Sequence, residues 1–287
     1  MKIGSFNFNN RRDVCIYAEI GINHNGSMEI AKKLIDIAAE CGCNGVKFQK
    51  RTPELCVPEE QKNILRETPW GLITYLEYRF KVEFSTKQMG ELAQYTKDKK
   101  IDWFVSCWDE QSLDEMIALD PVAIKLPSPL LTNEKMIRKL KSSGLPAIWS
   151  TGMSTLNEVD HAYKLFSDIP NIMCHCNSTY PAKYEELNLN FIKVLLQNYK
   201  KSIIGYSGHE VGLIPTIVAA VLGARYVERH ITLDRALWGT DQAASVEPQG
   251  LKRLVRDIRD LNLIMGNGEK VVYDSELAVR KKLRKLI

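Results

Sequence analysis

Short apolar runs alternate with amphipathic stretches eight times along this sequence, and that repeat strongly limits the folds open to the chain. Apolar runs of about four to eight residues are typical of buried strands, whereas apolar residues spaced three and four apart are typical of helices. The expected strands are Ile16–Gly21, Gly45–Lys50, Trp103–Trp108, Ala123–Ser128, Ala147–Gly152, Ile172–Ser178, Ile203–Ser207 and Tyr226–Ile231. The helical stretches that follow them include Ser27–Cys41, Asp109–Leu119, Asn133–Ser142, Thr155–Phe166, Leu213–Leu222 and Pro248–Met265.

Eight strand–helix units without a domain-sized linker predict a single α/β domain, a (β/α)8 TIM barrel over residues 1–266. A doubly wound open sheet is the alternative, but that fold more often has a G-x-G-x-x-G turn, which the first strand here lacks. Thr132 and Ser154 are expected to cap helix N-termini, and Gly144 and Gly223 to end helices. The long connection Arg51–Phe84 is expected to be irregular, and such excursions commonly carry function or cover a site.

Composition describes an ordinary globular protein, with 45% hydrophobic and 26% charged residues. No segment reaches the roughly 20 apolar residues of a membrane span, and the start lacks the apolar core of a signal peptide, so we expect a cytoplasmic protein without a membrane partner. A net charge of +4 is too small to imply nucleic acid. Seven cysteines without a C-x-x-C pair predict reduced thiols; two C-x-C pairs, at Cys41/Cys43 and Cys174/Cys176, leave a soft metal site as a weaker alternative.

Polar side chains gather where the expected strands end. Glu19 closes the first strand, and Asn23 and His24 follow it in the loop. Residues i and i+2 of a strand share a face, so several polar residues should point into the barrel, opposite apolar neighbours that pack on the helices. These residues are Lys47, Gln49, Lys125, Ser207, His209, Glu228 and His230. Hydroxyl and amide groups add to them at Ser106, Ser128, Ser150, Thr151, Asn177 and Ser178.

Two inward lysines are costly unless something compensates their charge. Lys47 and Lys125 would be satisfied by a bound anion such as a carboxylate or phosphate. The alternative is that each pairs with a local acid such as Glu19 or Glu228. His209 and His230 fall at equivalent heights on adjacent strands, which suits two ligands of one divalent metal. Because imidazole binds metals only when neutral, activity is then expected to fall below about pH 6.5.

Seven segments, in order and on the expected strands, resemble the catalytic domain of the sialic acid synthase (N-acetylneuraminate synthase) family. They are AEIGINHNG, GVKFQ, IKLPS, STGM, HCNSTYPAKYEELNL, IGYSGHEVG and VERHITLDR. The resemblance implies that phosphoenolpyruvate condenses with the open-chain aldehyde of an N-acetylated hexosamine, giving a nine-carbon 2-keto-3-deoxy acid and phosphate. Legionaminic acid, pseudaminic acid or other 3-deoxy sugar acid synthases share this chemistry. A catalytically weak sugar-binding barrel is the alternative from another class.

The resemblance also assigns roles to residues. It implies that His209 and His230 hold Mn²⁺ or Mg²⁺, that Glu19 acts near the metal and the attacking water, and that Tyr180 and Asp241 face the sugar. It places phosphoenolpyruvate on Lys47, Lys125, Ser128, Ser150, Ser178 and Ser207. The further substrate contacts that it implies are Gln49, Cys107, Asn177 and Glu228.

Three departures from the family pattern concern the substrates. Cys107 replaces a usual threonine, and Leu130 stands in Pro127–Leu130 where the family has an acid near the sugar. Most members continue into an antifreeze-like domain that gives the partner's active site an arginine, which implies a homodimer; residues 267–287 resemble only the start of a linker to that domain. We therefore expect an altered, less polar acceptor pocket. We also expect the Arg51–Phe84 segment to fold over the barrel mouth as a substitute cap, with aromatic and basic residues at Trp70, Tyr75, Tyr78 and Arg79.

Overall fold

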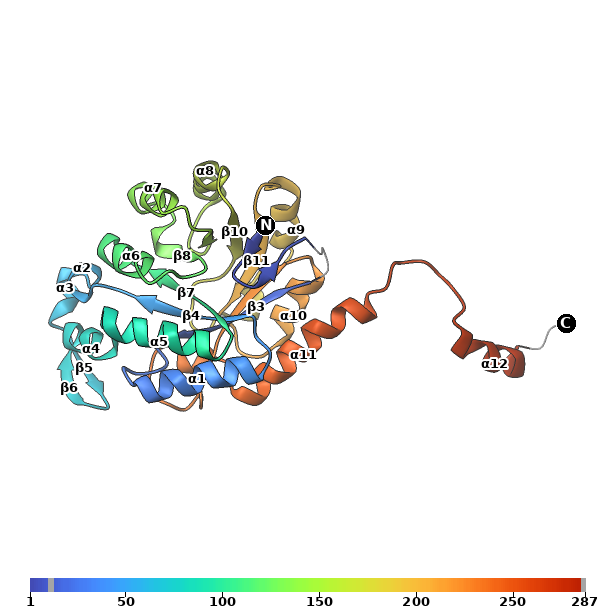
Figure 1. Cartoon of the computed structure of the whole chain (residues 1–287), viewed down its shortest axis with the longest axis horizontal. Helices are drawn as coiled ribbons and strands as arrows, with labels where there is room; N and C mark the ends of the chain where they lie inside the picture. The colour runs from blue at the N-terminus through green and yellow to red at the C-terminus, as the bar shows by residue number, and fades with distance from the viewer. Residues whose placement is uncertain (10–12, 285–287) are drawn as a thin grey trace.

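Eight parallel strands close into a barrel inside a ring of helices (Figure 1), in a computed structural model that describes residues 1–9 and 13–284. The barrel strands are β3 (Cys15–Gly21), β4 (Gly45–Lys50), β7 (Asp102–Cys107), β8 (Ile124–Leu126), β9 (Ala147–Ser150), β10 (Asn171–His175), β11 (Ile203–Gly208) and β12 (Tyr226–His230). Each pairs in parallel with its sequence neighbours, and β12 pairs with β3 to complete the circle. The predicted (β/α)8 barrel is confirmed, and the open-sheet alternative is wrong.

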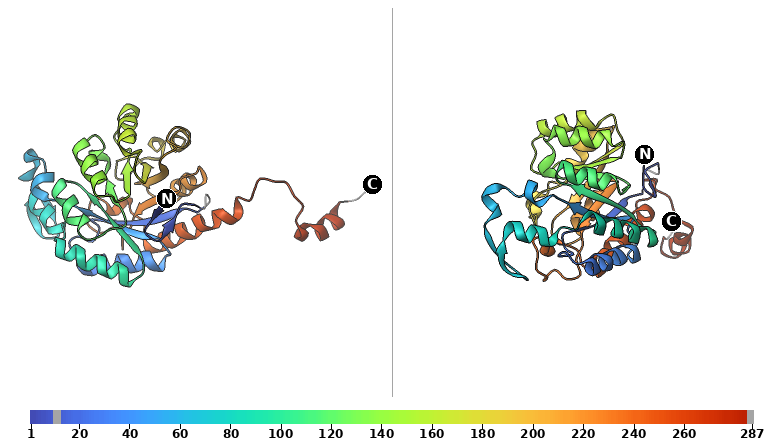
Figure 2. Two further views of the ribbon diagram at one scale, coloured as in Figure 1. Left: turned by 45° about the horizontal axis from the view of Figure 1, so that its top comes forward. Right: turned by 60° about the vertical axis from the view of Figure 1, so that its left-hand side comes forward.

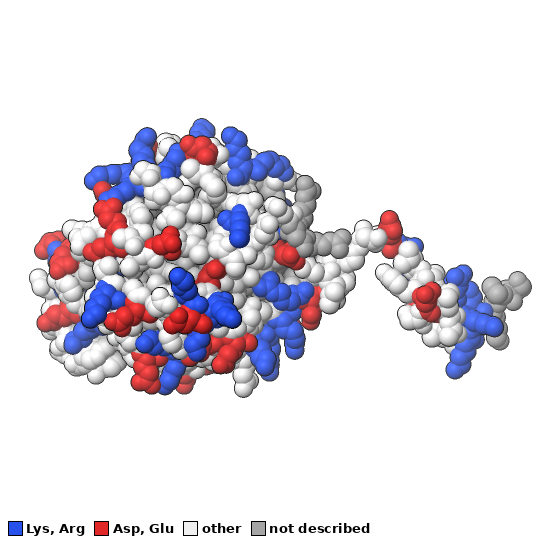
Figure 3. All heavy atoms as spheres, viewed as in Figure 1, with Lys and Arg blue, Asp and Glu red and all other residues white. Residues whose placement is uncertain are grey.

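A ring of helices surrounds the barrel (Figure 2), and each helix buries apolar residues against it. The helices are α1 (Met28–Glu40), α5 (Thr86–Asp98), α6 (Glu110–Ile117), α7 (Glu134–Ser142), α8 (Leu156–Phe166), α9 (Phe191–Asn198), α10 (Ile214–Val221) and α11 (Pro248–Ile264). Short 3-10 turns follow three of the strands, at Ser128–Leu130, Tyr184–Glu186 and Gln242–Ala244. Acidic and basic side chains are mixed on the visible face of the barrel (Figure 3).

Several predicted boundaries are wrong by one to three residues. The strands expected to reach Ser128, Gly152 and Ser178 end at Leu126, Ser150 and His175. The first of these strands stops because Pro127 has no N–H to donate to a neighbouring strand. The expected helix caps Thr132 and Ser154 are each one residue early: the N-cap side chains are those of Asn133 and Thr155. Gly144 and Gly223 follow helices with φ of 74° and 110°, as predicted.

The barrel interior is apolar at one end and polar at the other. At the amino ends of the strands, Tyr17, Phe104, Cys174 and Tyr226 pack together with other buried apolar residues. A hairpin of β1 (Lys2–Ile3) and β2 (Phe6–Asn7) packs on the same cluster through Ile3 and Phe6, and Phe8 just after it is also buried there. The polar residues of the interior lie at the carboxyl end, where active sites of such barrels are found.

The Arg51–Phe84 connection is structured, so the expectation of an irregular segment is wrong. It contains α2 (Pro53–Cys56), α3 (Glu59–Lys62), a hairpin of β5 (Leu65–Thr68) and β6 (Gly71–Thr74), and α4 (Tyr75–Val82). Thr74 and Glu77 form a reciprocal capping box at the start of α4. The segment lies at one side of the barrel, where it is labelled in Figure 1.

Residues 266–284 are exposed and extend away from the barrel, ending in α12 (Asp274–Leu283) (Figure 1). Basic residues gather on that helix (Figure 3). The tail that was predicted at 267–287 lies outside the described residues from 285 onward, and its role as a linker stays a prediction. No helix within the described residues is long and apolar enough to cross a membrane.

Two glycines with positive φ differ in how closely other atoms approach them, so substituting each one distinguishes the cost of backbone strain from the cost of crowding. A Cβ on Gly26 (φ +75°) would lie 2.1 Å from the carbonyl oxygen of Lys81, whereas one on Gly71 (φ +96°) meets nothing within 4 Å. Gly71→Ala should therefore lose about 1 kcal/mol from strain alone. Gly26→Ala should lose about 2–3 kcal/mol more, because α4 must move away from the loop after β3. Urea unfolding of both variants checks this difference, and equal losses would contradict the close packing.

Candidate active site

A cavity of about 240 Å³ opens at the carboxyl end of the barrel. Its lining comes from all eight strands or the turns directly after them. The lining residues are Glu19, Lys47, Gln49, Ser106, Trp108, Lys125, Pro127, Ser128, Pro129, Ser150, Met153, Cys176, Ser178, Tyr180, Ser207, His209, Glu228 and His230. A wider and more open hollow of about 680 Å³ lies beside it over β9 and β10, and shares Met153, Cys176 and Ser178 with it.

Glu228 is the centre of the cavity floor, where it accepts from lysines on two other strands. Lys47 Nζ lies 3.0 Å from Glu228 Oε1, and Lys125 Nζ donates to the same oxygen. Ser207 Oγ also donates to Oε1 at 2.9 Å, and Tyr226 OH donates to Oε2 at 2.6 Å. The charged side chains are at most 5% exposed, so the whole network is out of water.

The second acid, Glu19, has a different environment. Its Oε2 atom lies 3.3 Å from Lys47 Nζ, and its Oε1 accepts from Gln49 Nε2 at 2.7 Å. Burial raises the pKa of Glu19 to about 7, and Lys47 only partly opposes this. Burial would also raise the pKa of Glu228, but Lys125 and Lys47 outweigh it and hold that pKa well below its usual range.

The lysines therefore have local acidic partners, which is the second of the two alternatives that the sequence left open. The first, a bound anion, is compatible with the remaining charge. Two ammonium groups face one firmly ionised carboxylate, Glu228, and the Glu19 carboxyl, whose pKa is about 7. Below pH 7 the cavity floor carries a net positive charge, which would attract an anionic ligand.

His209 and His230 lie side by side, with ring centroids 5.6 Å apart. His209 Nδ1 is 2.6 Å from the carbonyl oxygen of Asn177, which can only accept, so Nδ1 carries the proton. The lone pair of Nε2 then accepts from Tyr180 OH at 2.8 Å. His230 Nδ1 is buried without a hydrogen-bond partner, 3.6 Å from Asp241 Oδ2.

Both imidazoles are neutral well into the acid range. Burial lowers the pKa of His209 and of His230 to about 3. The expected loss of activity below pH 6.5 assumed histidines with ordinary pKa values, and this premise does not hold for His209 and His230. The pH dependence of the activity itself stays a prediction. Among the described residues, no group of three or more His, Cys, Asp or Glu side chains is arranged to hold a metal ion. The two C-x-C pairs form no such site, and all seven cysteines are free thiols.

Of the fifteen residues to which the family resemblance gives a role, twelve line the cavity and three do not. Cys107 faces the helices, buried in the apolar core, because its neighbours Ser106 and Trp108 occupy the inward positions of that strand. Asn177 reaches the site only through its carbonyl oxygen, since its side-chain Oδ1 accepts from the backbone N–H of Thr179. Asp241 lies behind His230 and outside the lining.

Other expectations near the site also change. Asn23 donates to the carbonyl oxygen of Ile231 and His24 stacks on Phe84 with ring centroids 4.0 Å apart, so both brace loops instead of facing the cavity. Leu130 packs against the apolar core. Trp108 and Met153 line the cavity although sequence reasoning missed them. Strand alternation applied to the third strand would have found Trp108 and excluded Cys107.

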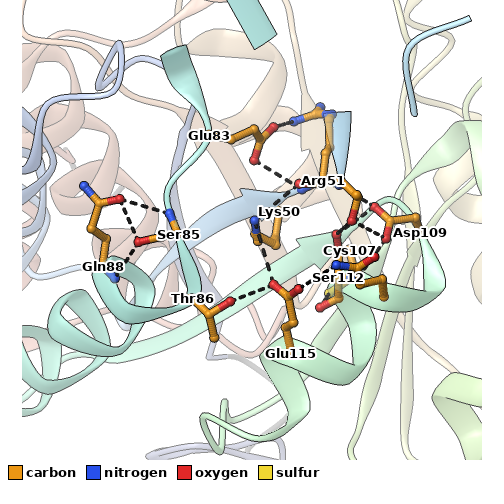
Figure 4. A network of polar contacts seen from close by, with 12 residues as sticks. Lys50, Arg51, Glu83, Ser85, Thr86, Gln88, Cys107, Asp109, Ser112 and Glu115 are labelled. Atoms are coloured by element: carbon orange, nitrogen blue, oxygen red, sulfur yellow. Dashed lines mark hydrogen bonds and ion pairs between the residues drawn. The ribbon is translucent and has the colours of Figure 1, made fainter. Parts of the chain in front are cut away.

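None of the described residues of the Arg51–Phe84 segment lines the cavity, so the expected cap over the site is not observed. Part of the segment's contact with the barrel is a polar network at the ends of β4 and β7 (Figure 4). There Thr52 donates to Asp109 through both its N–H, at 2.7 Å, and its hydroxyl, at 2.9 Å, and Asp109 also caps α6.

Fold and cavity together define a (β/α)8 barrel with a buried, lysine-rich site at the usual catalytic end. The chain belongs to the NeuB family, which it matches over residues 34–270, and the resemblance inferred from sequence motifs is confirmed. It is 34% identical to the N,N'-diacetyllegionaminic acid synthase of Legionella pneumophila, over 95% of this chain and 79% of that protein. It is also 34% identical to the N-acetylneuraminate-9-phosphate synthase of Homo sapiens, over 95% of this chain and 77% of that protein.

A solved structure agrees with this assignment. The N-acetylneuraminic acid (sialic acid) synthetase of Leptospira borgpetersenii, crystallised with citrate, superposes with a TM-score of 0.86 at 29% identity. The match covers 100% of this chain and 98% of that one. Together these relatives support a sugar acid synthase.

Adjacent residues on β7 give a matched test of the cavity lining. Ser106→Ala should raise the KM for an anionic substrate several-fold, because it removes one buried hydroxyl beside Lys125 while leaving packing intact. Cys107→Thr should leave that KM unchanged and alter stability by about 1 kcal/mol, since its side chain packs toward α6. Steady-state kinetics and urea unfolding check both variants. A KM effect confined to Cys107→Thr would contradict the orientation of this strand.

The raised pKa of Glu19 predicts an unusual dependence of stability on pH. The folded protein binds a proton at about pH 7 that the unfolded chain binds at about 4.5, so stability should fall as pH rises between these values. The effect amounts to about 3 kcal/mol at full ionisation. Glu19→Gln should flatten this slope and make the protein relatively more stable at pH 7.5. Urea unfolding at pH 5, 6 and 7.5 measures it, with the exposed Glu60→Gln as control; an unchanged slope in Glu19→Gln would refute the assignment.

Proposed function

We propose that this protein condenses phosphoenolpyruvate with the open-chain aldehyde of an N-acetylated hexosamine, giving a nine-carbon 2-keto-3-deoxy acid and phosphate. The single observation that carries the proposal is the pair of buried lysines that share Glu228 on the cavity floor. Membership of a family whose relatives synthesise sialic and legionaminic acids gives this site its reaction class.

The cavity residues would have separate roles in this reaction. Lys47 and Lys125 would bind the carboxylate and phosphate of phosphoenolpyruvate, with donors from Ser106, Ser128, Ser150, Ser178 and Ser207 around them. Carbon three of the enol attacks the aldehyde carbon and water adds to carbon two, after which phosphate leaves. Glu19 is suited to move a proton in these steps, because its pKa of about 7 lets it exchange protons at neutral pH.

Two features of the histidine pair fit a divalent metal, Mn²⁺ or Mg²⁺. His209 is held by the Asn177 carbonyl in the tautomer that keeps a lone pair on Nε2, and a metal would take the place of the Tyr180 hydroxyl that donates to this atom. His230 has an unpartnered buried Nδ1. Both imidazoles are neutral, as metal ligands must be. When bound, the metal would act as a Lewis acid on the aldehyde oxygen. Its remaining ligands would come from substrate, water or Asp241.

The acceptor is expected to differ from plain N-acetylmannosamine. The cavity wall beside the charged floor includes Trp108, Pro127, Pro129 and Met153, which offer apolar surface and no acid. A deoxygenated or diacetamido hexosamine would lose fewer hydrogen bonds against such a wall than a fully hydroxylated sugar. We expected this acceptor because the acid that the family has near the sugar is absent here. The apolar surface that would contact the sugar comes from Trp108, Pro127 and Pro129, because Leu130 does not line the cavity.

Phosphate release tests the function directly. Enzyme, phosphoenolpyruvate and Mn²⁺ should release phosphate only with a matching aldehyde from a panel that includes N-acetylmannosamine and 6-deoxy diacetamido hexosamines. Lys125→Met should reduce the rate by at least about a hundredfold, since it removes an anion-binding charge from a closed site. Release that ignores every aldehyde would sink the proposal, and binding of phosphoenolpyruvate without turnover would favour a non-catalytic sugar-binding barrel.

The same assay tests the metal. Chelation should abolish turnover, added Mn²⁺ should restore it, and His209→Ala should weaken Mn²⁺ binding in calorimetry. His161→Ala is the control, because His161 lies on α8 paired with Glu134 at the surface. Full activity after exhaustive chelation would remove the metal from the mechanism.

A further inference from the structure

Arg51 connects the Arg51–Phe84 segment to two residues that line the cavity. It is the first residue after β4, and it is 8% exposed. Its Nη2 atom donates to Gln49 Oε1 at 2.6 Å. Its guanidinium carbon lies 3.9 Å from the centre of the Trp108 ring. None of the family motifs gives Arg51 a role.

The contact with Arg51 decides how the Gln49 amide is oriented. A guanidinium has only donors, so the atom of Gln49 that meets it must be the carbonyl oxygen. Gln49 Nε2 then points the other way and donates to Glu19 Oε1 at 2.7 Å. In the reversed amide two donors would face each other at Arg51, and an ionised Glu19 would face a second acceptor. The hydrogen bond at Arg51 would be lost whether or not Glu19 carries a proton, which makes the reversed form unfavourable.

We propose that Arg51 is a positioning residue, through which the Arg51–Phe84 segment fixes Gln49 and Trp108 in the cavity. Gln49 in turn holds Glu19, so a segment that never enters the cavity controls the geometry of its acid. The inference builds on the proposed function, because it assigns this control to the synthase site.

The segment holds Arg51 firmly at its other end. The backbone N–H of Arg51 donates to Glu83 Oε2 at 3.2 Å, and its Nη1 lies 3.5 Å from Glu83 Oε1 (Figure 4). Glu83 is the C-cap residue of α4, and its Oε1 also accepts from Arg79 Nη2 at 3.1 Å. One buried carboxylate therefore binds two arginines, of which only Arg51 reaches cavity residues.

Lysine should not replace Arg51. The planar guanidinium packs over the Trp108 ring with its face and hydrogen-bonds Gln49 with its edge. An ammonium group has no flat face, so it cannot make both contacts at once. A lysine could keep the charge near Glu83 but not the stack. If Arg51 only balanced the charge of Glu83, lysine could replace it; if its planar shape positions Gln49 and Trp108, lysine could not.

Arg51→Met and Arg79→Met form a matched pair, because each removes one buried arginine from the same Glu83. Arg51→Met should lower kcat about 10- to 100-fold with a smaller change in the KM for phosphoenolpyruvate, as expected for a misplaced reacting group. Arg51→Lys should recover little of that loss. Arg79→Met should lose comparable stability in urea and keep both kinetic constants within about threefold of wild type.

A double variant tests whether Arg51 acts through Gln49. In the Gln49→Leu background, adding Arg51→Met should reduce kcat by a smaller factor than it does alone, since the group through which Arg51 holds Glu19 is already gone and only the contact with Trp108 remains. Effects that multiply in full would show that Arg51 acts independently and would overturn the inference. Equal kinetic losses in Arg51→Met and Arg79→Met would overturn it as well, because they would reduce Arg51 to a structural role.

Crystal structures of the variants separate this inference from the proposed reaction, because they need no turnover. In Arg51→Met the Gln49 amide should leave Glu19 or the Trp108 ring should rotate, and in Arg79→Met both should stay in place. If wild type turns over no aldehyde but these shifts occur, the reaction fails while the positioning role stands. Unchanged Gln49 and Trp108 in Arg51→Met would end the inference whatever the enzyme catalyses.

Discussion

The carboxylate of Glu228 is the interaction on which this structure depends. It lies on β12, while its two lysines come from β4 and β8, so one acid links three strands across the barrel interior. Removing Glu228 or its lysines would leave buried charge without compensation, which costs several kcal/mol of folding free energy. The network can exist only in a closed lumen of fixed width. The apolar filling beneath it, with Tyr17, Phe104 and Tyr226, supplies that rigidity.

The same network explains why two acids of one cavity behave differently. Glu228 accepts from both lysines, from Ser207 and from Tyr226, and stays ionised. Glu19 shares only Lys47 and an amide, so burial dominates and its pKa rises to about 7. Pairs of carboxyl groups with separated pKa values are the usual sign of divided roles in acid–base chemistry. Here one acid serves structure and lysine placement, and the other is free to exchange a proton.

Sequence reasoning reached the barrel, the charged floor and the histidine pair because each is a consequence of strand alternation. Lys47, Lys125, Glu228 and His230 sit opposite apolar neighbours, and that pattern has only one solution in a closed barrel. It failed for Cys107, where a family position was carried over without checking the face of the strand. It also failed for Arg51–Phe84, because the contacts that order this segment are with side chains distant in sequence, such as Trp238 against Trp70 and Tyr78.

These contacts make the segment a brace instead of a lid. Arg51 fixes Gln49 on one side of the site, and Trp70 and Tyr78 pack on Trp238, which lies in the loop that carries Asp241. The segment thus contacts residues next to Glu19 and His230 at two places, and none of its own residues lines the cavity. A lid would have to open for substrate, but a brace leaves the mouth accessible while holding the groups at its edge. The barrel strands and the turns after them form the cavity, and the Arg51–Phe84 segment holds residues at its edge. Trp108 belongs to both arrangements, because it lines the cavity and also contacts Arg51.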